Sequence, residues 1–304
     1  KMKTTTSHLK EIVMQGVFTA CACISILAVA LICIFLFANG LPTIFEIGSL
    51  KFLLGTIWKP GNNLYGILPM ILGSIYVTAG AIIVGVPIGL LTAIYMSRFA
   101  SPRINKVLLP AVQLLAGIPS VVYGFFGMIV MVPAVQAMVK SDFFKTVLHV
   151  KSGKGMSLFT ASLLLGIMIL PTIIRTTQES LKTVPQGYRE GAMGLGAGKW
   201  HIIRTIVLPC SIDGIVTGCI LAVGRIVGES AALLFTAGAA EVIAKSVFKA
   251  YTSNGATLSV LLYLRAFEDG DFTSAWGIGA VLLVLVLAIN LAARLAKTKL
   301  KQKQ

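Results

Sequence analysis

The stretch LPMILGSIYVTAGAIIVGVPIGLLTAIYM, residues 68–96, contains no charged side chain. A helix needs about 20 mostly apolar residues to cross the hydrocarbon core of a bilayer, so this run is long enough to span one with some tilt. Five further apolar runs lie on either side of it, at 12–37, 107–132, 157–174, 212–237 and 275–296. Together the runs predict an all-α integral membrane protein with six transmembrane helices.

Composition supports this class. The chain has 304 residues, of which 56% are hydrophobic and 12% charged, and its mean hydropathy is +0.89. A soluble domain of this size needs a more polar surface. The net charge of +15 lies mainly between the apolar runs, which is typical of the positive-inside bias, so we expect a lipid bilayer and no nucleic acid as partner.

The distribution of basic residues predicts the orientation. With the N-terminus in the cytoplasm, the inner segments contain fifteen Lys and Arg residues and the outer segments nine. This asymmetry favours both termini in the cytoplasm. We read the first run as a retained helix, because it is longer than a signal-peptide core.

Proline and glycine occur inside several runs. Pro87 lies between Gly85 and Gly89, whose spacing allows close helix approach, and Pro119 and Pro171 lie in the third and fourth runs. We expect these residues to interrupt the helices, which is tolerated where neighbours or a cavity satisfy the freed backbone groups. We expect each of them to serve in packing rather than in transport.

No soluble catalytic centre is evident. The histidines His8, His149 and His201 lack metal-ligand spacing, and the five cysteines lie in or beside apolar runs without a CxxC pattern. No segment matches G-x-x-x-x-G-K-[ST], the phosphate-cradling loop of ATPases. We therefore expect no enzyme activity, metal or cofactor in this chain. If it moves a solute with ATP, another chain hydrolyses the ATP.

The segment YREGAMGLGAGKWHIIRTIVLP, residues 188–209, carries the most specific spacing. It resembles the coupling loop of ABC importer permeases, whose pattern is E-A-A, three residues, G, nine residues and I-x-L-P. Glu190, Ala192 and Gly196 match, and Gly191 replaces the first alanine. We expect a helix-turn-helix that docks on a soluble partner through a face bearing Trp200, Ile203 and Val207. The plainer alternative is an amphipathic loop lying on the membrane surface.

Charge within the membrane is the second signal. Arg225 and Glu229 lie in the fifth run, four residues apart, and we expect them on one helical face near the bilayer midplane. Arg175 lies at the inner end of the fourth run. Guanidinium groups suit an oxyanion, with Glu229 moderating the positive field. The alternatives are a structural ion pair for Arg225 and a snorkelling side chain for Arg175.

Three segments resemble the phosphate-specific ABC importer permeases of the PstC/PstA family: LLAGIPSVVYGFFG (114–127), LPTIIRTTQESLKTVPQGYREGAMGLGAGKW (170–200) and GRIVGES (224–230). The N-terminal part, including 52–97, is closer to the PstC type. The resemblance implies a MetI-like core of five helices at 67–297, with a coupling loop at about 185–209. It also implies an N-terminal helix and external segment at 1–66 and a basic cytoplasmic tail at 298–304.

The resemblance further implies partners and roles. The partners would be a homologous second permease, an external phosphate-binding protein and two ATPase subunits that hold ATP and Mg²⁺, all at a bacterial inner membrane. Arg175, Arg225 and Glu229 would lie along the phosphate path, and Glu190, Gly191, Ala192 and Gly196 would couple to the ATPase. Two alternatives stay open: a permease for sulfate or molybdate, and a secondary transporter or channel, which would show inverted repeats.

Overall fold

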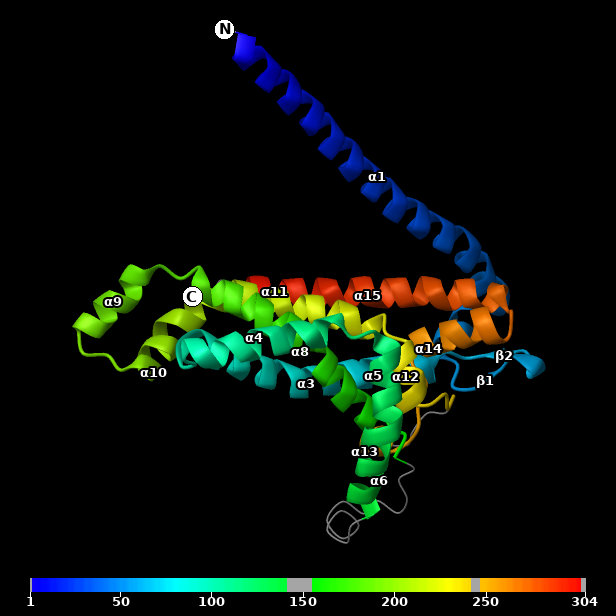
Figure 1. Ribbon diagram of the computed structural model, residues 1–304. Coiled ribbons are helices and arrows are strands. Elements are labelled where there is room, and N and C mark those ends of the chain that lie inside the picture. The colour runs from blue at the N-terminus through cyan, green and yellow to red at the C-terminus, as the bar shows by residue number, and fades with distance from the viewer. Residues whose placement is uncertain (1, 141–154, 242–246, 302–304) are drawn as a thin grey trace.

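Long helices dominate the computed structural model, which describes residues 2–140, 155–241 and 247–301. Six helical segments of this described part are long and apolar enough to cross a membrane, which confirms the predicted number. Four of them are α1 (Met2–Ile47), α3 (Leu68–Arg98), α8 (Leu158–Lys182) and α15 (Phe272–Lys301). Figure 1 shows α3, α8 and α15 running in the same general direction within one bundle.

Helices α3 and α8 form the centre of the bundle. Their close approach depends on two glycines of α3: a Cβ on Gly85 would lie 2.7 Å from Cδ1 of Ile169, and one on Gly89 would lie 2.8 Å from Cγ2 of Ile173. Ile169 and Ile173 are buried in the core. The predicted packing role of Gly85 and Gly89 is therefore confirmed.

The third run is where the expected helix boundaries are wrong. Instead of one helix over 107–132, the chain forms α4 (Pro102–Gly117) and α5 (Ser120–Phe126), followed by the π-helical turn η2 (Gly127–Met131) and α6 (Val132–Lys140). The helix ends because a residue before proline avoids the α region, and Ile118 before Pro119 is extended. The membrane-spanning candidate is residues 120–140. In Figure 1 it runs across the direction of the other helices.

The other two prolines do not interrupt their helices, which corrects the expectation. Pro87 lies inside α3 and Pro171 inside α8, and both helices are continuous. Each forfeits a backbone hydrogen bond.

The fifth run is also divided. Helical structure begins before residue 212, with α10 (Lys199–Ile202), and continues through the π-helical turn η3 (Ile203–Val207) into α11 (Leu208–Val227). It ends at Val227 instead of continuing to residue 237. Residues 228–230 separate α11 from the short helix α12 (Ala231–Thr236).

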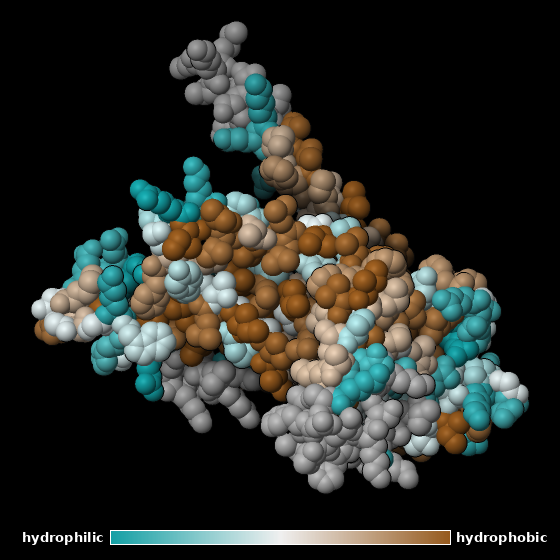
Figure 2. Space-filling view, turned by 60° about the horizontal axis from the view of Figure 1, so that its bottom comes forward, coloured by the Kyte–Doolittle hydropathy of each residue, from teal (hydrophilic) through white to brown (hydrophobic). Residues whose placement is uncertain are grey.

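Short elements gather at the two ends of the bundle. One end carries α9 (Gln186–Gly194), α10 and the end of α15 (Figure 1). The other end carries these elements: α2 (Ser49–Leu54), β1 (Trp58–Lys59), η1 (Pro60–Asn62), β2 (Leu64–Tyr65), α14 (Leu258–Tyr263) and η4 (Leu264–Glu268). α13 (Val247–Thr252) packs against α8 and α3. Strands β1 and β2 pair antiparallel, with Trp58 opposite Tyr65. Figure 2 shows an apolar band between two hydrophilic ends.

Helix α1 joins the bundle through its second half only. Phe35 packs edge-on against Trp276 of α15, and a Cβ on Gly40 would lie 2.6 Å from the carbonyl oxygen of Trp276. The first half of α1 extends away from the bundle (Figure 1). Its most apolar stretch has no buried residue, so this stretch is free to contact lipid or another protein.

Candidate anion path and coupling surface

The turn between α9 and α10 is built by a glycine. Gly196 has a φ of +84°, in the left-handed region that glycine adopts most easily. Its N–H donates to the carbonyl of Met193 at 2.9 Å, and the N–H of Ala197 donates to the carbonyl of Ala192 at 3.0 Å. These two bonds form a Schellman motif, which ends α9 and turns the chain into α10.

The tip formed by α9 and α10 presents an apolar surface to its surroundings. Leu195 is 91% exposed, and the other large side chains in this group are also exposed: Tyr188, Met193 and Trp200. Glu190 and Gly191 are exposed beside them, and nothing lies within 4 Å of a Cβ on Gly191. The tip therefore has room for a partner that covers apolar side chains.

The composition of this docking face differs from the sequence expectation. Ile203 and Val207 are 4% and 0% exposed and pack against Ile94 and Leu181. Only Trp200 of the three expected residues faces outward. The reason is the intervening turn: Ile203 and Val207 belong to the segment that enters the bundle, where they cover the ends of α3 and α8.

Arg225 lies at the end of its helix instead of in the middle of it. α11 ends at Val227, so Arg225 occupies its last turn, where a cation interacts favourably with the helix dipole. Glu229 lies in the break beyond the helix, where its carboxylate accepts a hydrogen bond from the N–H of Ala232 at 3.2 Å. Among the described residues no ion pair joins Arg225 to Glu229. The expectation that they share one helical face is wrong, because the helix stops between them.

Helix α5, which follows the break at Pro119, packs against α12, which follows the break at 228–230. A Cβ on Gly124 of α5 would lie 2.7 Å from Cδ2 of Phe235 and 3.0 Å from Cα of Ala232, both in α12. Phe125 and Phe235 pack edge to face. Helix α5 therefore packs against α12, the helix that directly follows GRIVGES, although about 100 residues separate the two helices in the sequence.

Arg175 lines a groove between α4 and α8. The cavity has a volume of about 490 Å³ and also contains Gln113, Gln178 and Glu179. Arg175 Nε lies 3.5 Å from Oε1 of Glu179, and both side chains are largely exposed. Such an exposed pair contributes little stability. Within the described chain Arg175 and Arg225 form no direct contact, so the structure places these two guanidiniums at separate points.

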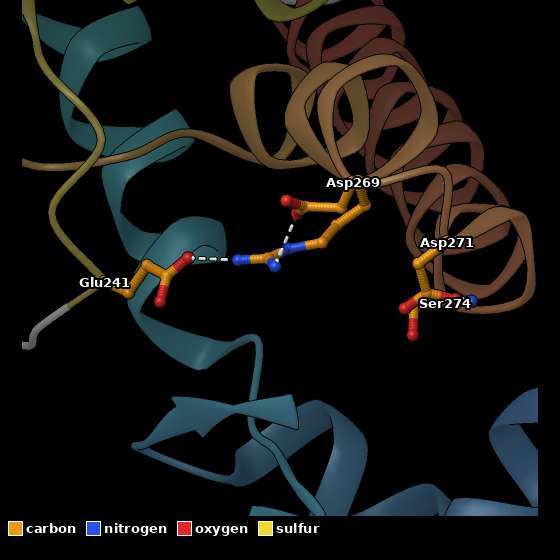
Figure 3. Close-up of polar contacts among 5 residues, drawn as sticks. Glu241, Asp269, Asp271 and Ser274 are labelled. Carbon is orange, nitrogen blue, oxygen red and sulfur yellow. Dashed lines mark hydrogen bonds and ion pairs between the residues drawn. The ribbon is translucent and has the colours of Figure 1, made fainter. Parts of the chain in front are cut away.

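The opposite end of the bundle contains a charged cluster that the sequence analysis did not identify. Arg265 of η4 lies 2.7 Å from Glu241 and 2.6 Å from Asp269 (Figure 3). Its guanidinium also lies 5.5 Å from the ring centroid of Trp58. Burial raises the pKa of Glu241, and Arg265 partly offsets that effect. The i,i+4 spacing of Arg265 and Asp269 could have indicated their ion pair from the sequence. Glu241 lies 24 residues from Arg265, so no local pattern indicates that contact.

Comparison with known proteins identifies the family. Residues 85–303 match the model of the binding-protein-dependent transport system inner membrane component. The chain is 34% identical over 302 residues to the probable ABC transporter permease protein YqgH of Bacillus subtilis, covering 97% of this chain and 93% of that one. It is 31% identical to the phosphate transport system permease protein PstC of Mesorhizobium japonicum, covering 94% and 89%.

A solved structure supports the fold. The MetNI methionine ABC transporter in an inward-facing conformation aligns with a TM-score of 0.52 at 18% identity, covering 80% of this chain and 99% of that chain. The MetI-like core expected from the sequence is thereby confirmed at the level of the fold. The chain belongs to the family of binding-protein-dependent transport system inner membrane components and is a multi-pass inner membrane protein.

Proposed function

We propose that this chain is one of two permease subunits of an ABC importer that carries inorganic phosphate. In this proposal an external phosphate-binding protein delivers the anion, and two partner ATPase subunits bind ATP and Mg²⁺ and drive the cycle. The observation that carries the proposal is the exposed apolar tip, held by the Schellman turn at Gly196. A channel or secondary transporter has no need of such a docking surface.

The anion path in this proposal runs past the two helix breaks. Arg225 lies beside the junction of α5 and α12 and is exposed, so its guanidinium is free to meet an oxyanion. Glu229 lowers the net positive charge there, and Arg175 supplies a second cation in the groove between α4 and α8. Broken helices with a charged residue near the break are typical of transport sites.

Phosphate is favoured over other oxyanions by the relatives. The Mesorhizobium japonicum relative is named as a phosphate permease. Uptake by the complete complex in proteoliposomes tests this choice, with radioactive phosphate outside and ATP inside. We expect a tenfold excess of unlabelled phosphate to suppress uptake and the same excess of sulfate or molybdate to leave it unchanged. Suppression by sulfate or molybdate alone would assign the permease to that anion.

Coupling is tested at Gly196. Gly196→Val places a β-branched residue at positive φ and should detach the ATPase or uncouple ATP hydrolysis from uptake, because the Schellman turn fails. Gly196→Asn is the matched control, since asparagine tolerates this conformation. If the valine variant retains both ATPase co-purification and uptake, the tip is not the coupling surface.

The orientation is also a proposal: both termini and the tip face the cytoplasm, with the Arg265 cluster outside. Residues 1–66 then form the N-terminal helix and external segment, 67–297 the core, and 298–304 the basic tail. In a cysteine-free background, Thr183→Cys should react with an impermeant maleimide from the cytoplasmic side only, and Asn62→Cys from the outside only. External labelling of Thr183→Cys would reverse the orientation.

A further inference from the structure

A groove runs between α11 and α15 on the outside of the helix bundle. Its volume is about 630 Å³. Ile220 and Leu221 of α11 form one wall, and Leu287 and Leu291 of α15 form the other. Leu221, Leu287 and Leu291 are 55%, 57% and 59% exposed. The groove is therefore an apolar surface that the described part of the chain leaves uncovered.

One end of this groove is basic. Thr217, Arg294 and Lys297 line it there. Arg294 lies two turns beyond Leu287 on α15, about 10 Å along the helix axis. The candidate membrane span of α15 ends at Leu295, so both cations lie at the edge of the apolar span. This end of α15 lies at the same end of the bundle as α9 and α10 (Figure 1).

The two cations differ in how their charge is compensated. Nζ of Lys297 donates to Oγ1 of Thr217 at 3.1 Å and lies 3.7 Å from Oδ1 of Asp213. Arg294 is exposed, and its side chain forms no ion pair with any residue that the structure describes. The groove therefore presents an uncompensated guanidinium at the end of an apolar channel.

The ligand that matches this arrangement has an apolar chain and an anionic head. A guanidinium forms paired hydrogen bonds with the oxygens of a phosphate group. An acyl chain covers aliphatic side chains without burying any polar group. Basic pockets between transmembrane helices bind anionic lipid headgroups in this way. Free phosphate would use Arg294 alone and would gain nothing from the aliphatic walls.

We propose that the groove binds one anionic phospholipid of the leaflet at the end of α9 and α10. Arg294 donates to the lipid phosphate, and Lys297 adds to the positive potential around it. An acyl chain lies between Leu221 and Leu287 and bridges α11 to α15. Leu221 lies one turn from Arg225 on the exposed face of α11, so the lipid also supports the helix that carries Arg225. The inference goes beyond the proposed function, because it holds whichever solute the chain carries.

The test introduces a photoreactive side chain into the groove of the complete complex. Leu287 is replaced with p-benzoylphenylalanine, which forms a covalent bond to a nearby C–H group on irradiation. The complex is placed in nanodiscs of equal parts phosphatidylglycerol and phosphatidylcholine, and mass spectrometry identifies what is attached to the permease chain. We expect phosphatidylglycerol adducts to exceed phosphatidylcholine adducts about fivefold, because a basic residue near the membrane surface favours an anionic lipid by about this factor.

Variants make the result specific. Arg294→Gln should abolish the enrichment while the contacts of Lys297 stay in place, and Arg294→Lys should retain part of it. Arg103→Gln changes an exposed arginine outside the groove and should leave the enrichment unchanged. The same probe at Ile83, which is 70% exposed on α3, should show no enrichment.

Several results would overturn the proposal. Equal attachment of the two lipids in the otherwise unmodified complex, or enrichment that persists in Arg294→Gln, would show that Arg294 selects no anionic headgroup. Attachment to the second permease would make the groove a subunit interface instead. Loss of the enrichment when excess inorganic phosphate is added would assign Arg294 to the free anion.

Discussion

The continuous helices α3 and α8 differ from the interrupted pairs α4–α5 and α11–α12, although both kinds contain residues that break helices. Pro87 and Pro171 lie inside continuous helices, whereas the chain breaks at Pro119 and again at 228–230. The most apolar stretches of α3 and α8 are 44% and 67% buried, against 22% and 28% for residues 120–140 and 199–227.

This difference shows that tight packing is one condition under which a helix continues through a proline. Where neighbouring helices pack tightly, as across Gly85 and Gly89, the packing holds a helix together despite a lost backbone hydrogen bond. The chain breaks at Pro119 and at 228–230, where packing is looser, but loose packing alone does not produce a break, because Pro110 lies inside the continuous helix α4, which has no buried residue. Arg225 and Glu229 lie beside the loosely packed break, whereas the tight packing occurs in α3 and α8, at the centre of the bundle.

The largest effect should come from the charge at the break. Arg225→Gln should assemble normally, because the described residues give Arg225 no ion-pair partner, and phosphate uptake should fall about 10–100-fold. That range follows from losing a charge-assisted hydrogen bond of about 1.5–3 kcal/mol. Adding Glu229→Gln should not restore uptake. Complex assembly and uptake are measured together, with Arg103→Gln as control, and normal uptake in the double variant leaves Arg225 only a structural role.

The next effect concerns the tightly packed pair. Gly85→Ala should lower the free energy of unfolding by about 1–3 kcal/mol, because the new Cβ meets Ile169 and the carbonyl of Gly166. Gly224→Ala in α11 is the matched control, since nothing lies within 4 Å of a Cβ there. It should stabilise by up to about 1 kcal/mol through reduced backbone entropy. Thermal unfolding in detergent measures both, and equal effects would contradict the contrast.

A smaller effect should distinguish Pro171 from Pro119 in thermal stability and in uptake. Pro171→Ala should change the stability of the continuous helix α8 by about 1 kcal/mol or less, because neighbours already hold it, and uptake should persist. Pro119→Ala permits α4 and α5 to join into one helix, which would move Tyr123 and Gly124 away from α12. We expect reduced uptake with unchanged thermal stability for Pro119→Ala. The reverse ranking of the two variants would show that packing does not govern the breaks.

The smallest effect is electrostatic and lies at the far end of the bundle. Burial raises the pKa of Glu241, so the folded protein retains this proton to higher pH than the unfolded chain does. Its contribution to stability is therefore greatest below the unfolded pKa and declines as pH rises through the folded pKa. Glu241→Gln lacks this dependence. The melting temperature of the wild type relative to that of the variant should fall as pH rises. A difference that stays constant with pH would contradict the raised pKa.

Much of the fold could be predicted from the sequence, and less of the site. The six spans follow from hydropathy, and the helix-turn-helix at 188–209 follows from the motif spacing, with Gly196 in the turn. Three inner prolines looked alike in sequence, yet only Pro119 ends a helix. Arg225 and Glu229 were expected on one helical face, but the helix ends between them.

The sequence by itself determined the membrane class, the number of spanning helices and the family, because apolar length and motif spacing are local properties of the chain. Only the tertiary structure decided that Ile203 and Val207 are buried, that the two broken pairs meet, and that Leu221 and Leu287 line one groove. Each of these depends on segments far apart in the sequence. Burial, break position and cavity shape are set by the neighbours a helix acquires on folding, which no local pattern specifies.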